Sequence, residues 1–220
     1  MYRHQWQNKQ FTNLPTGKVV CIGRNYVEHA KELDNPIPSS PLLFIKPATS
    51  LVAFDNEVTL NAALGEHHYE AELALLIGSK IDAGTSAPLM HIAGIGLALD
   101  LTLRDLQSEL KAQGHPWERA KAYDNSCPIT PFVPCDENTF AKNIEYRFWQ
   151  NGELKQHGDS SLMIFPITEL LKEVSRYFTL QPGDIVLTGT PKGVGSLAQG
   201  DKLKLRMEQH PAWHSEVILK

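Results

Sequence analysis

The 220-residue sequence has no long hydrophobic run, no excess of positive charge and few cysteines. No stretch approaches the roughly 18 apolar residues that a membrane-spanning helix needs, and the opening residues MYRHQWQNKQ lack the apolar run of a signal peptide. A net charge of −4 gives no basic surface for nucleic acid or an anionic membrane. We therefore expect a small-molecule partner, no nucleic-acid or membrane partner, and a cytoplasmic location.

The cysteines, Cys21, Cys127 and Cys135, are odd in number and have no paired spacing. This pattern fits a reducing compartment, where each is most simply a small buried apolar side chain. The sequence also lacks repeats, linkers and low-complexity tracts. With 42% hydrophobic and 21% charged residues, it has the composition of an ordinary globular protein, and we expect one domain.

Segments with the pattern of β-strands outnumber those with the pattern of helices. Apolar or alternating runs predict strands at 18–23, 42–45, 67–78, 94–102, 184–187 and 202–207, and Asn151-Gly152 predicts a hairpin turn. Helical spacing predicts helices at 24–33, 103–113 and 167–178. Because the two kinds of element do not alternate regularly, the predicted class is mainly β with some α (α+β).

Four prolines, Pro36, Pro38, Pro41 and Pro47, follow the first predicted helix closely. Proline fixes φ and removes a hydrogen-bond donor, so this segment should be an extended surface loop. A helix followed by such a loop is typical of a lid, which we predict at about 24–41.

Two glutamates stand out in the otherwise apolar strand at 67–78. Glu70 and Glu72 are two apart and point to the same face, about 6.5–7 Å apart at their Cα atoms. Such like charges resist burial unless a cation or water lies between them. Asp100, near the end of the next strand, supplies a third carboxylate, and such a set suits Mg²⁺, with Mn²⁺ or Ca²⁺ as alternatives. The pattern alone leaves open a solvated edge strand with Asp100 as a helix cap.

A histidine and a glutamate share one face of the helix predicted at 24–33. His29 and Glu32 are three residues apart, which makes them neighbours on a helix. A glutamate that accepts from one imidazole nitrogen raises the basicity of the other, as a water-activating base requires. The alternative is an incidental pair on a solvated helix.

Lysines and a glycine-rich loop supply candidate contacts for an anion. Lys46 and Lys121 lie at loop starts in apolar company, where either would neutralise an anionic substrate or a developing oxyanion, although most lysines face solvent. The loop TGTPKGVG lacks the Gly-Lys-Ser/Thr ending of a phosphate loop. Backbone N–H groups at Gly189 and Thr190 remain candidate anion contacts, with a simple strand connection as the alternative.

These residues lie in six segments spread over nearly the whole chain: CIGRNYVEHAKE, LLFIKP, HHYEAELALLIG, GIGLALDLTLRDLQ, PWERAKAYDNSCPI and PGDIVLTGTPKGVG. In this order they resemble the fumarylacetoacetate hydrolase (FAH) family, specifically its short single-domain members, which include acylpyruvate hydrolases and oxaloacetate decarboxylases. The resemblance implies one catalytic domain over 1–220, a mixed β-roll with a metal site at its mouth, and a homodimer.

The resemblance also implies roles for individual residues. The positions that match metal ligands are Glu70, Glu72 and Asp100. The positions that match the lining of the substrate pocket are Arg24, Lys46, Gln107, Gly189 and Thr190. His29 held by Glu32 matches the water-activating pair on the lid, and Lys121 would lie beside the metal as an electrostatic catalyst. The sequence has no extra N-terminal domain and no further acidic ligand, so water would complete the metal shell.

The implied function is a Mg²⁺-dependent hydrolase or lyase of small 2-oxo (β-diketo) acids, which cleaves a C–C bond through a metal-bound enolate. An acylpyruvate hydrolase would use water for this step, whereas an oxaloacetate decarboxylase would release CO₂. An isomerase or tautomerase of oxaloacetate or a hydroxymuconate-type diacid would need only proton transfer through the same enolate. The alternative from another class is a catalytically idle protein that binds oxo acids.

Overall fold

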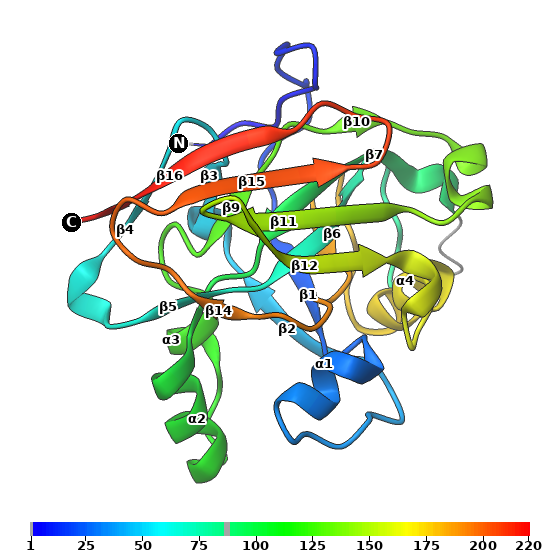
Figure 1. The fold of residues 1–220 in the computed structure, drawn as a ribbon. Coiled ribbons are helices and arrows are strands. Elements are labelled where there is room, and N and C mark those ends of the chain that lie inside the picture. The colour runs from blue at the N-terminus through cyan, green and yellow to red at the C-terminus, as the bar shows by residue number, and fades with distance from the viewer. Residues whose placement is uncertain (1, 86–88) are drawn as a thin grey trace.

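The computed structural model describes residues 2–85 and 89–220, which form a mainly β protein with a few helices, as predicted (Figure 1). Within those residues the largest sheet has eight strands and is mixed. Its order is β2 (Leu42–Lys46), β1 (Val19–Gly23), β13 (Ile185–Leu187), β6 (Ala71–Ile77), β7 (Ile92–Leu99), β9 (Cys127–Ile129) and β3 (Leu51–Ala53), with β10 (Val133–Pro134) paired to β7.

Two smaller sheets complete the β-structure of the described residues. A five-stranded sheet has the order β12 (Glu153–Asp159), β11 (Glu145–Gln150), β15 (Lys202–Met207), β16 (Trp213–Leu219) and β4 (Glu57–Leu60). A three-stranded sheet has the order β14 (Gly195–Ser196), β5 (His67–Tyr69) and β8 (Thr102–Leu103). The pairs β1–β13, β3–β9 and β4–β16 are parallel, and the other pairs are antiparallel.

The helices are α1 (Val27–Glu32), α2 (Arg104–Gln113), α3 (Glu118–Lys121) and α4 (Ile167–Tyr177). Short 3₁₀ turns cover Ala48–Ser50, Ala62–Leu64, Leu89–His91, Glu137–Ala141 and Ser160–Leu162. Helices α1, α2 and α3 gather at one end of the sheets, whereas α4 lies at another side (Figure 1). That end holds the candidate site described below.

The main hydrophobic core lies between the large sheet and the five-stranded sheet. Side chains of β1, β6 and β7 meet those of β11, β15 and β16 there. Alternation along β6 explains the division, because Leu73 and Leu75 join this core while Ala74 and Leu76 face a second cluster on the opposite side of the sheet. Both faces of β6 are therefore buried, which accounts for its continuous apolar run.

Local sequence signals explain several element ends. Helix α2 ends at Gly114, which has the left-handed φ of 68° that glycine adopts without strain. The β11–β12 hairpin turns at Asn151 and Gly152, with φ values of 53° and 83°, as an Asn-Gly turn requires. Two predicted strands are interrupted. The strand expected at 67–78 breaks at Glu70 between β5 and β6, and the strand expected at 94–102 breaks at Asp100 and Leu101 between β7 and β8.

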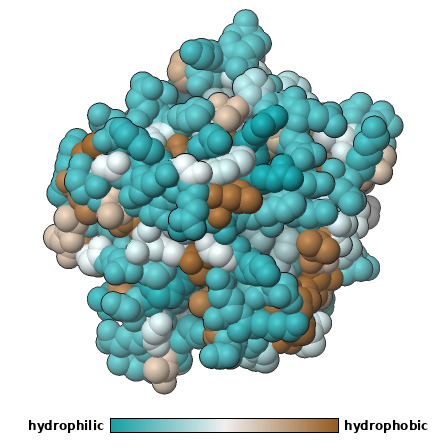
Figure 2. Space-filling model, in the orientation of Figure 1, coloured by the Kyte–Doolittle hydropathy of each residue, from teal (hydrophilic) through white to brown (hydrophobic). Residues whose placement is uncertain are grey.

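The molecular face shown in Figure 2 is mostly hydrophilic, with small separate hydrophobic patches. Within residues 2–85 and 89–220, no helix is long and apolar enough to cross a membrane. Cys21 and Cys127 are buried and Cys135 is half-buried, and all three are free thiols.

Candidate active site

Strand pairing brings together acids that are 30 residues apart in the sequence. Strands β6 and β7 are antiparallel neighbours, with Ala71 opposite Leu99. One residue further along this pairing, the Asp100 N–H donates a hydrogen bond of 2.8 Å to the Glu70 carbonyl oxygen. Glu72 lies two residues from Glu70 and presents its side chain to the same side. The three carboxylates therefore meet where β6 begins and β7 ends.

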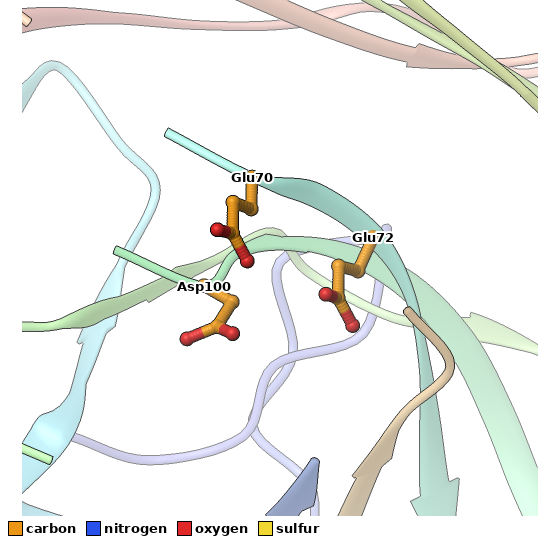
Figure 3. A group of neighbouring side chains, drawn as sticks. All are labelled: Glu70, Glu72 and Asp100. Atoms are coloured by element: carbon orange, nitrogen blue, oxygen red, sulfur yellow. The ribbon is translucent and has the colours of Figure 1, made fainter. Parts of the chain in front are cut away.

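The three side chains point toward one another (Figure 3). One oxygen from each of Glu70, Glu72 and Asp100 lies within 4.8 Å of the others. The residues are only 6%, 2% and 1% exposed. The alternative of a solvated edge strand is therefore wrong. Asp100 is not a helix cap either, because the residue that precedes α2 is Leu103 and makes no side-chain cap.

Basic side chains neutralise this acidic cluster. The Lys121 ammonium donates to Glu70 Oε2 at 2.8 Å and to Asp100 Oδ2 at 2.7 Å. The Arg104 guanidinium donates to Glu70 Oε1. Lys46 Nζ lies 2.8 Å from Asp100 Oδ1, in an ion pair without hydrogen-bond alignment. Three basic groups thus face three acids in a buried site, where unpaired charges are costly.

The two glutamates differ in acidity because their partners differ. Burial raises the pKa of Glu70, but Lys121 and Arg104 outweigh it, so this pKa lies well below its usual range. Burial and repulsion from Asp100 and Glu70 hold the pKa of Glu72 well above its usual range. For Lys121, burial lowers the pKa, but Asp100 and Glu70 outweigh it and raise it. One carboxyl of the group, Glu72, is therefore poised to hold a proton.

The donor set fits a hard divalent cation. All three side chains offer oxygen, the ligand that Mg²⁺, Mn²⁺ and Ca²⁺ prefer. Glu72 Oε2 accepts a 2.7 Å hydrogen bond from the Gly189 N–H, which orients the carboxylate toward the other acids. Asp100 Oδ1 is buried and has no aligned hydrogen bond. Glu70, Glu72 and Asp100 are thus the residues that could hold the metal.

His29 of the predicted His29–Glu32 pair lies on the wall of the same pocket. His29 is buried and lines the pocket. Its Nδ1 donates to Glu32 Oε2 at 3.3 Å, which leaves Nε2 free to accept a proton. Glu32 Oε1 accepts a 2.9 Å hydrogen bond from the Gly193 N–H. One carboxylate therefore orients the imidazole and ties α1 to the glycine-rich loop.

The pocket above the acids has a volume of about 130 Å³. It brings together most of the residues predicted for the site. Among these, its lining includes Arg24, His29, Glu70, Glu72, Asp100, Gln107, Lys121 and Thr190. Four residues of the predicted lid, Arg24, His29, Leu33 and Asn35, form one wall.

Two residues predicted to line the substrate pocket lie behind its surface. Lys46 is 0% exposed, and its ammonium contacts Asp100, Ser126 and the Lys121 carbonyl oxygen. Gly189 uses its N–H on Glu72. Its φ of 96° and a close approach of its Cα to Asn25 demand glycine there, because a Cβ would lie 2.6 Å from Asn25 Cβ. Both residues support the acids rather than face the pocket.

Two supporting residues were missed from the sequence. Arg104 donates to Glu70 and, at 2.8 Å, to Gln107. An arginine four residues after Asp100, at the start of a predicted helix, was a signal that could have found it. Gln156 on β12 binds the Ala71 N–H and Thr190 Oγ1, each at 2.8 Å, and so fixes β6 against the glycine-rich loop. A glutamine in an alternating strand gives no comparable signal.

The chain is similar in sequence and in fold to known proteins of one family. The family described as fumarylacetoacetate (FAA) hydrolase C-terminal matches residues 18–218. Oxaloacetate tautomerase YcgM of Escherichia coli K12 is 45% identical over 213 residues, which cover 96% of this chain and 97% of that protein. A mitochondrial oxaloacetate decarboxylase of Dictyostelium discoideum is 41% identical over 85% of this chain and 87% of its own length.

A solved structure extends the comparison to a bound state. Fumarylpyruvate hydrolase of Pseudomonas aeruginosa, in complex with Mn²⁺ and pyruvate, superposes with a TM-score of 0.89 at 33% identity. The match covers 100% of this chain and 96% of that one. The likeness therefore includes the whole β-architecture, and it confirms the fold predicted from the six segments.

Proposed function

The chain belongs to the fumarylacetoacetate hydrolase family, and we propose that it acts on small 2-oxo acids by stabilising their enolate beside a divalent cation. The observation that carries this proposal is the convergence of Glu70, Glu72 and Asp100, next to Lys121, on the floor of a small pocket. These three acids would hold the cation, whose positive charge would stabilise the enolate of the substrate.

The first reaction we propose is keto–enol tautomerisation of oxaloacetate. This reaction moves a proton from C3 to the keto oxygen through an enolate, and water is not a reactant. Lys121 contributes a buried ammonium beside the acids, where a positive charge stabilises a developing oxyanion. The 45% identity to an oxaloacetate tautomerase over nearly the whole chain supports this choice.

The second candidate is C–C cleavage, as in an acylpyruvate hydrolase or an oxaloacetate decarboxylase. The hydrogen bond between His29 and Glu32 favours the hydrolytic version, because it leaves Nε2 ready to take a proton from water. Tautomerisation has no need of such a water-activating pair. The two reactions share the enolate, so one site can support both.

Three further properties belong to the proposal. We propose Mg²⁺ as the physiological cation, on the oxygen-only donor set. We also propose a homodimer and a cytoplasmic location, on the family resemblance and the composition. Light scattering on the purified protein would test the dimer.

Purified protein with Mg²⁺ should be incubated with oxaloacetate, a series of acylpyruvates and a hydroxymuconate-type diacid, with a chelator as control. We expect turnover that the chelator abolishes. Turnover that survives chelation would remove the metal from the proposal. No turnover of any compound would favour a catalytically idle protein that binds oxo acids.

The two reactions can be separated by replacing the histidine. In His29→Ala we expect hydrolysis of acylpyruvates to fall by about 10²–10⁴-fold, the usual contribution of a general base, while oxaloacetate tautomerisation is largely retained. His214→Ala is the matched control, because His214 is exposed and outside the pocket lining. Equal loss of all activities in His29→Ala would contradict water activation as its role.

A further inference from the structure

The mouth of the pocket carries positive charge that the protein does not neutralise. Besides Glu70, Glu72 and Asp100 on the floor, the lining contains no acidic residue among those described. Arg24 and Lys111 also line the pocket. Within residues 2–85 and 89–220, neither has a carboxylate oxygen within 4.0 Å of its charged nitrogens. They differ in this from Lys46, Lys121 and Arg104, which all contact the acids.

Arg24 has two further features of a ligand-binding residue. It is half-buried, and its φ of 59° lies in the left-handed region that arginine rarely adopts. Such a conformation costs free energy and persists where the surrounding structure imposes it, often at binding sites. Arginine is also suited to bind a carboxylate through two parallel hydrogen bonds.

Lys111 reaches the same region from helix α2. Its ammonium donates a 3.1 Å hydrogen bond to Asn35 Oδ1 on the predicted lid. Arg24, Arg104 and Lys111 all line this pocket. Partial burial and the positive charges of Arg24 and Arg104 lower the pKa of Lys111. Arg104 is already engaged by Glu70 and Gln107, so Arg24 and Lys111 are the cations left for a ligand.

The charges of the pocket define the ligand. The floor has three acids and three basic groups, so the two charges of a bound divalent cation would match the carboxylate and enolate oxygen of the substrate's 2-oxo acid end. A second negative group is needed to neutralise the mouth. We propose that Arg24 and Lys111 bind the distal carboxylate of the substrate, so that the pocket selects 2-oxo diacids over acylpyruvates that end in a neutral group. This inference rests on the proposed function, which it narrows to a substrate class.

The test compares oxaloacetate with its 4-methyl ester, which keeps the 2-oxo acid end and loses the distal charge. We expect the wild-type protein to prefer the diacid in kcat/KM. In Lys111→Met and in Arg24→Gln that preference should fall about five- to tenfold each, as for loss of a charge-assisted hydrogen bond at a partly exposed site. Lys172→Met is the matched control, because Lys172 is exposed on α4 and outside the pocket lining.

Oxalate tests binding at the floor alone, because it lacks the part of the substrate that carries the distal carboxylate. Its inhibition constant should change less than twofold in either variant. An unchanged preference for the diacid in both variants would overturn the inference. Equal losses for the diacid, the ester and oxalate would overturn it as well, since Lys111 would then act only by holding Asn35 and the lid.

Calorimetry gives the same comparison without turnover. The probes are 3,3-difluoro-oxaloacetate, which has no C3 proton to transfer, and its 4-methyl ester. The ratio of their dissociation constants should shift in the variants as the kinetic preference does. A wild-type protein that shows this binding ratio but no turnover would disprove the proposed function and retain the inference. Equal affinity of the wild-type protein for both probes would overturn the inference even if turnover is found.

Discussion

The charged side chains on the floor of the pocket have ion-pair partners within the part of the chain that the structure describes, whereas those at its mouth do not. On the floor, Glu70 and Asp100 are buried and share the ammonium of Lys121. At the mouth, Arg24 and Lys111 are partly or largely exposed and have no acidic partner among the described residues. Ion pairs within the protein therefore neutralise the charges of the floor, whereas the charges at the mouth are free to pair with a ligand.

The floor residues stabilise the site, and the mouth residues are the ones available to bind the ligand. Buried ion pairs need complete partners, because removal of one member leaves a charge without water or counter-ion. Half-exposed charges are hydrated and can exchange water for a ligand at low cost. We therefore expect floor substitutions to affect metal binding and stability, and mouth substitutions to affect mainly the choice of substrate.

The largest expected effect comes from Glu72→Gln. The raised pKa of Glu72 means that the metal-free protein already accommodates a neutral side chain there, and glutamine reproduces its shape and its hydrogen bond from Gly189. The variant should fold normally and lose metal-dependent turnover by about 10³-fold or more, since a metal ion contributes several kcal/mol to catalysis. Calorimetry with Mg²⁺ and a thermal melt measure the two properties. Retained metal affinity would remove Glu72 from the ligand set.

A large effect on stability is expected at Lys46. Lys46→Met keeps the aliphatic stem and removes the charge that faces Asp100, so the free energy of unfolding of the metal-free protein should fall by about 3 kcal/mol. Lys111→Met at the mouth should change it by about 0.5 kcal/mol or less. Urea denaturation in the presence of a chelator measures both. Similar losses of unfolding free energy in the two variants would show that the floor and the mouth do not differ in their contribution to stability.

The floor was also the part that the sequence could predict best. The shared face of Glu70 and Glu72 follows from strand periodicity, and the helix that follows Asp100 was correctly bounded at Gly114. Periodicity cannot supply the pairing partner of a strand. The antiparallel register that sets Glu70 opposite Asp100 became visible only in the folded chain.

The residues that hold the three acids in place were harder to predict, because they come from distant segments of the chain. Lys46 was expected in the pocket lining, but β2 carries it behind Asp100. Gln156 reaches Thr190 from the other sheet. The break at Glu70 was not predicted either, since an apolar run on both sides of it reads as one strand. Long-range packing rather than local propensity decides these positions.

We expect pH to have a moderate effect on metal binding at the floor, which further distinguishes the floor from the mouth. A metal ligand must be ionised, and the pKa of Glu72 is raised by burial and by repulsion from Asp100 and Glu70. The apparent affinity for Mg²⁺ should therefore rise with pH by up to about tenfold per unit below that pKa and level off above it. Calorimetry in two buffers of different ionisation heat should reveal about one proton released per Mg²⁺ in the rising range. Affinity that does not vary with pH would show that Glu72 is already ionised.

The smallest effect is expected from salt, and it acts on the mouth. Charges exposed to water are screened within about 10 Å at 0.1 M ionic strength, whereas buried pairs are screened much less. Raising the salt to about 0.5 M should therefore lower kcat/KM for oxaloacetate a few-fold, through weaker attraction of the dianion to Arg24 and Lys111. The Mg²⁺ concentration must be saturating throughout, so that the metal occupancy does not change. Lys111→Met should flatten this salt dependence, while Lys172→Met should keep it. If both variants respond to salt as the wild-type protein does, the mouth does not attract the substrate by charge, and its cations must serve the lid instead.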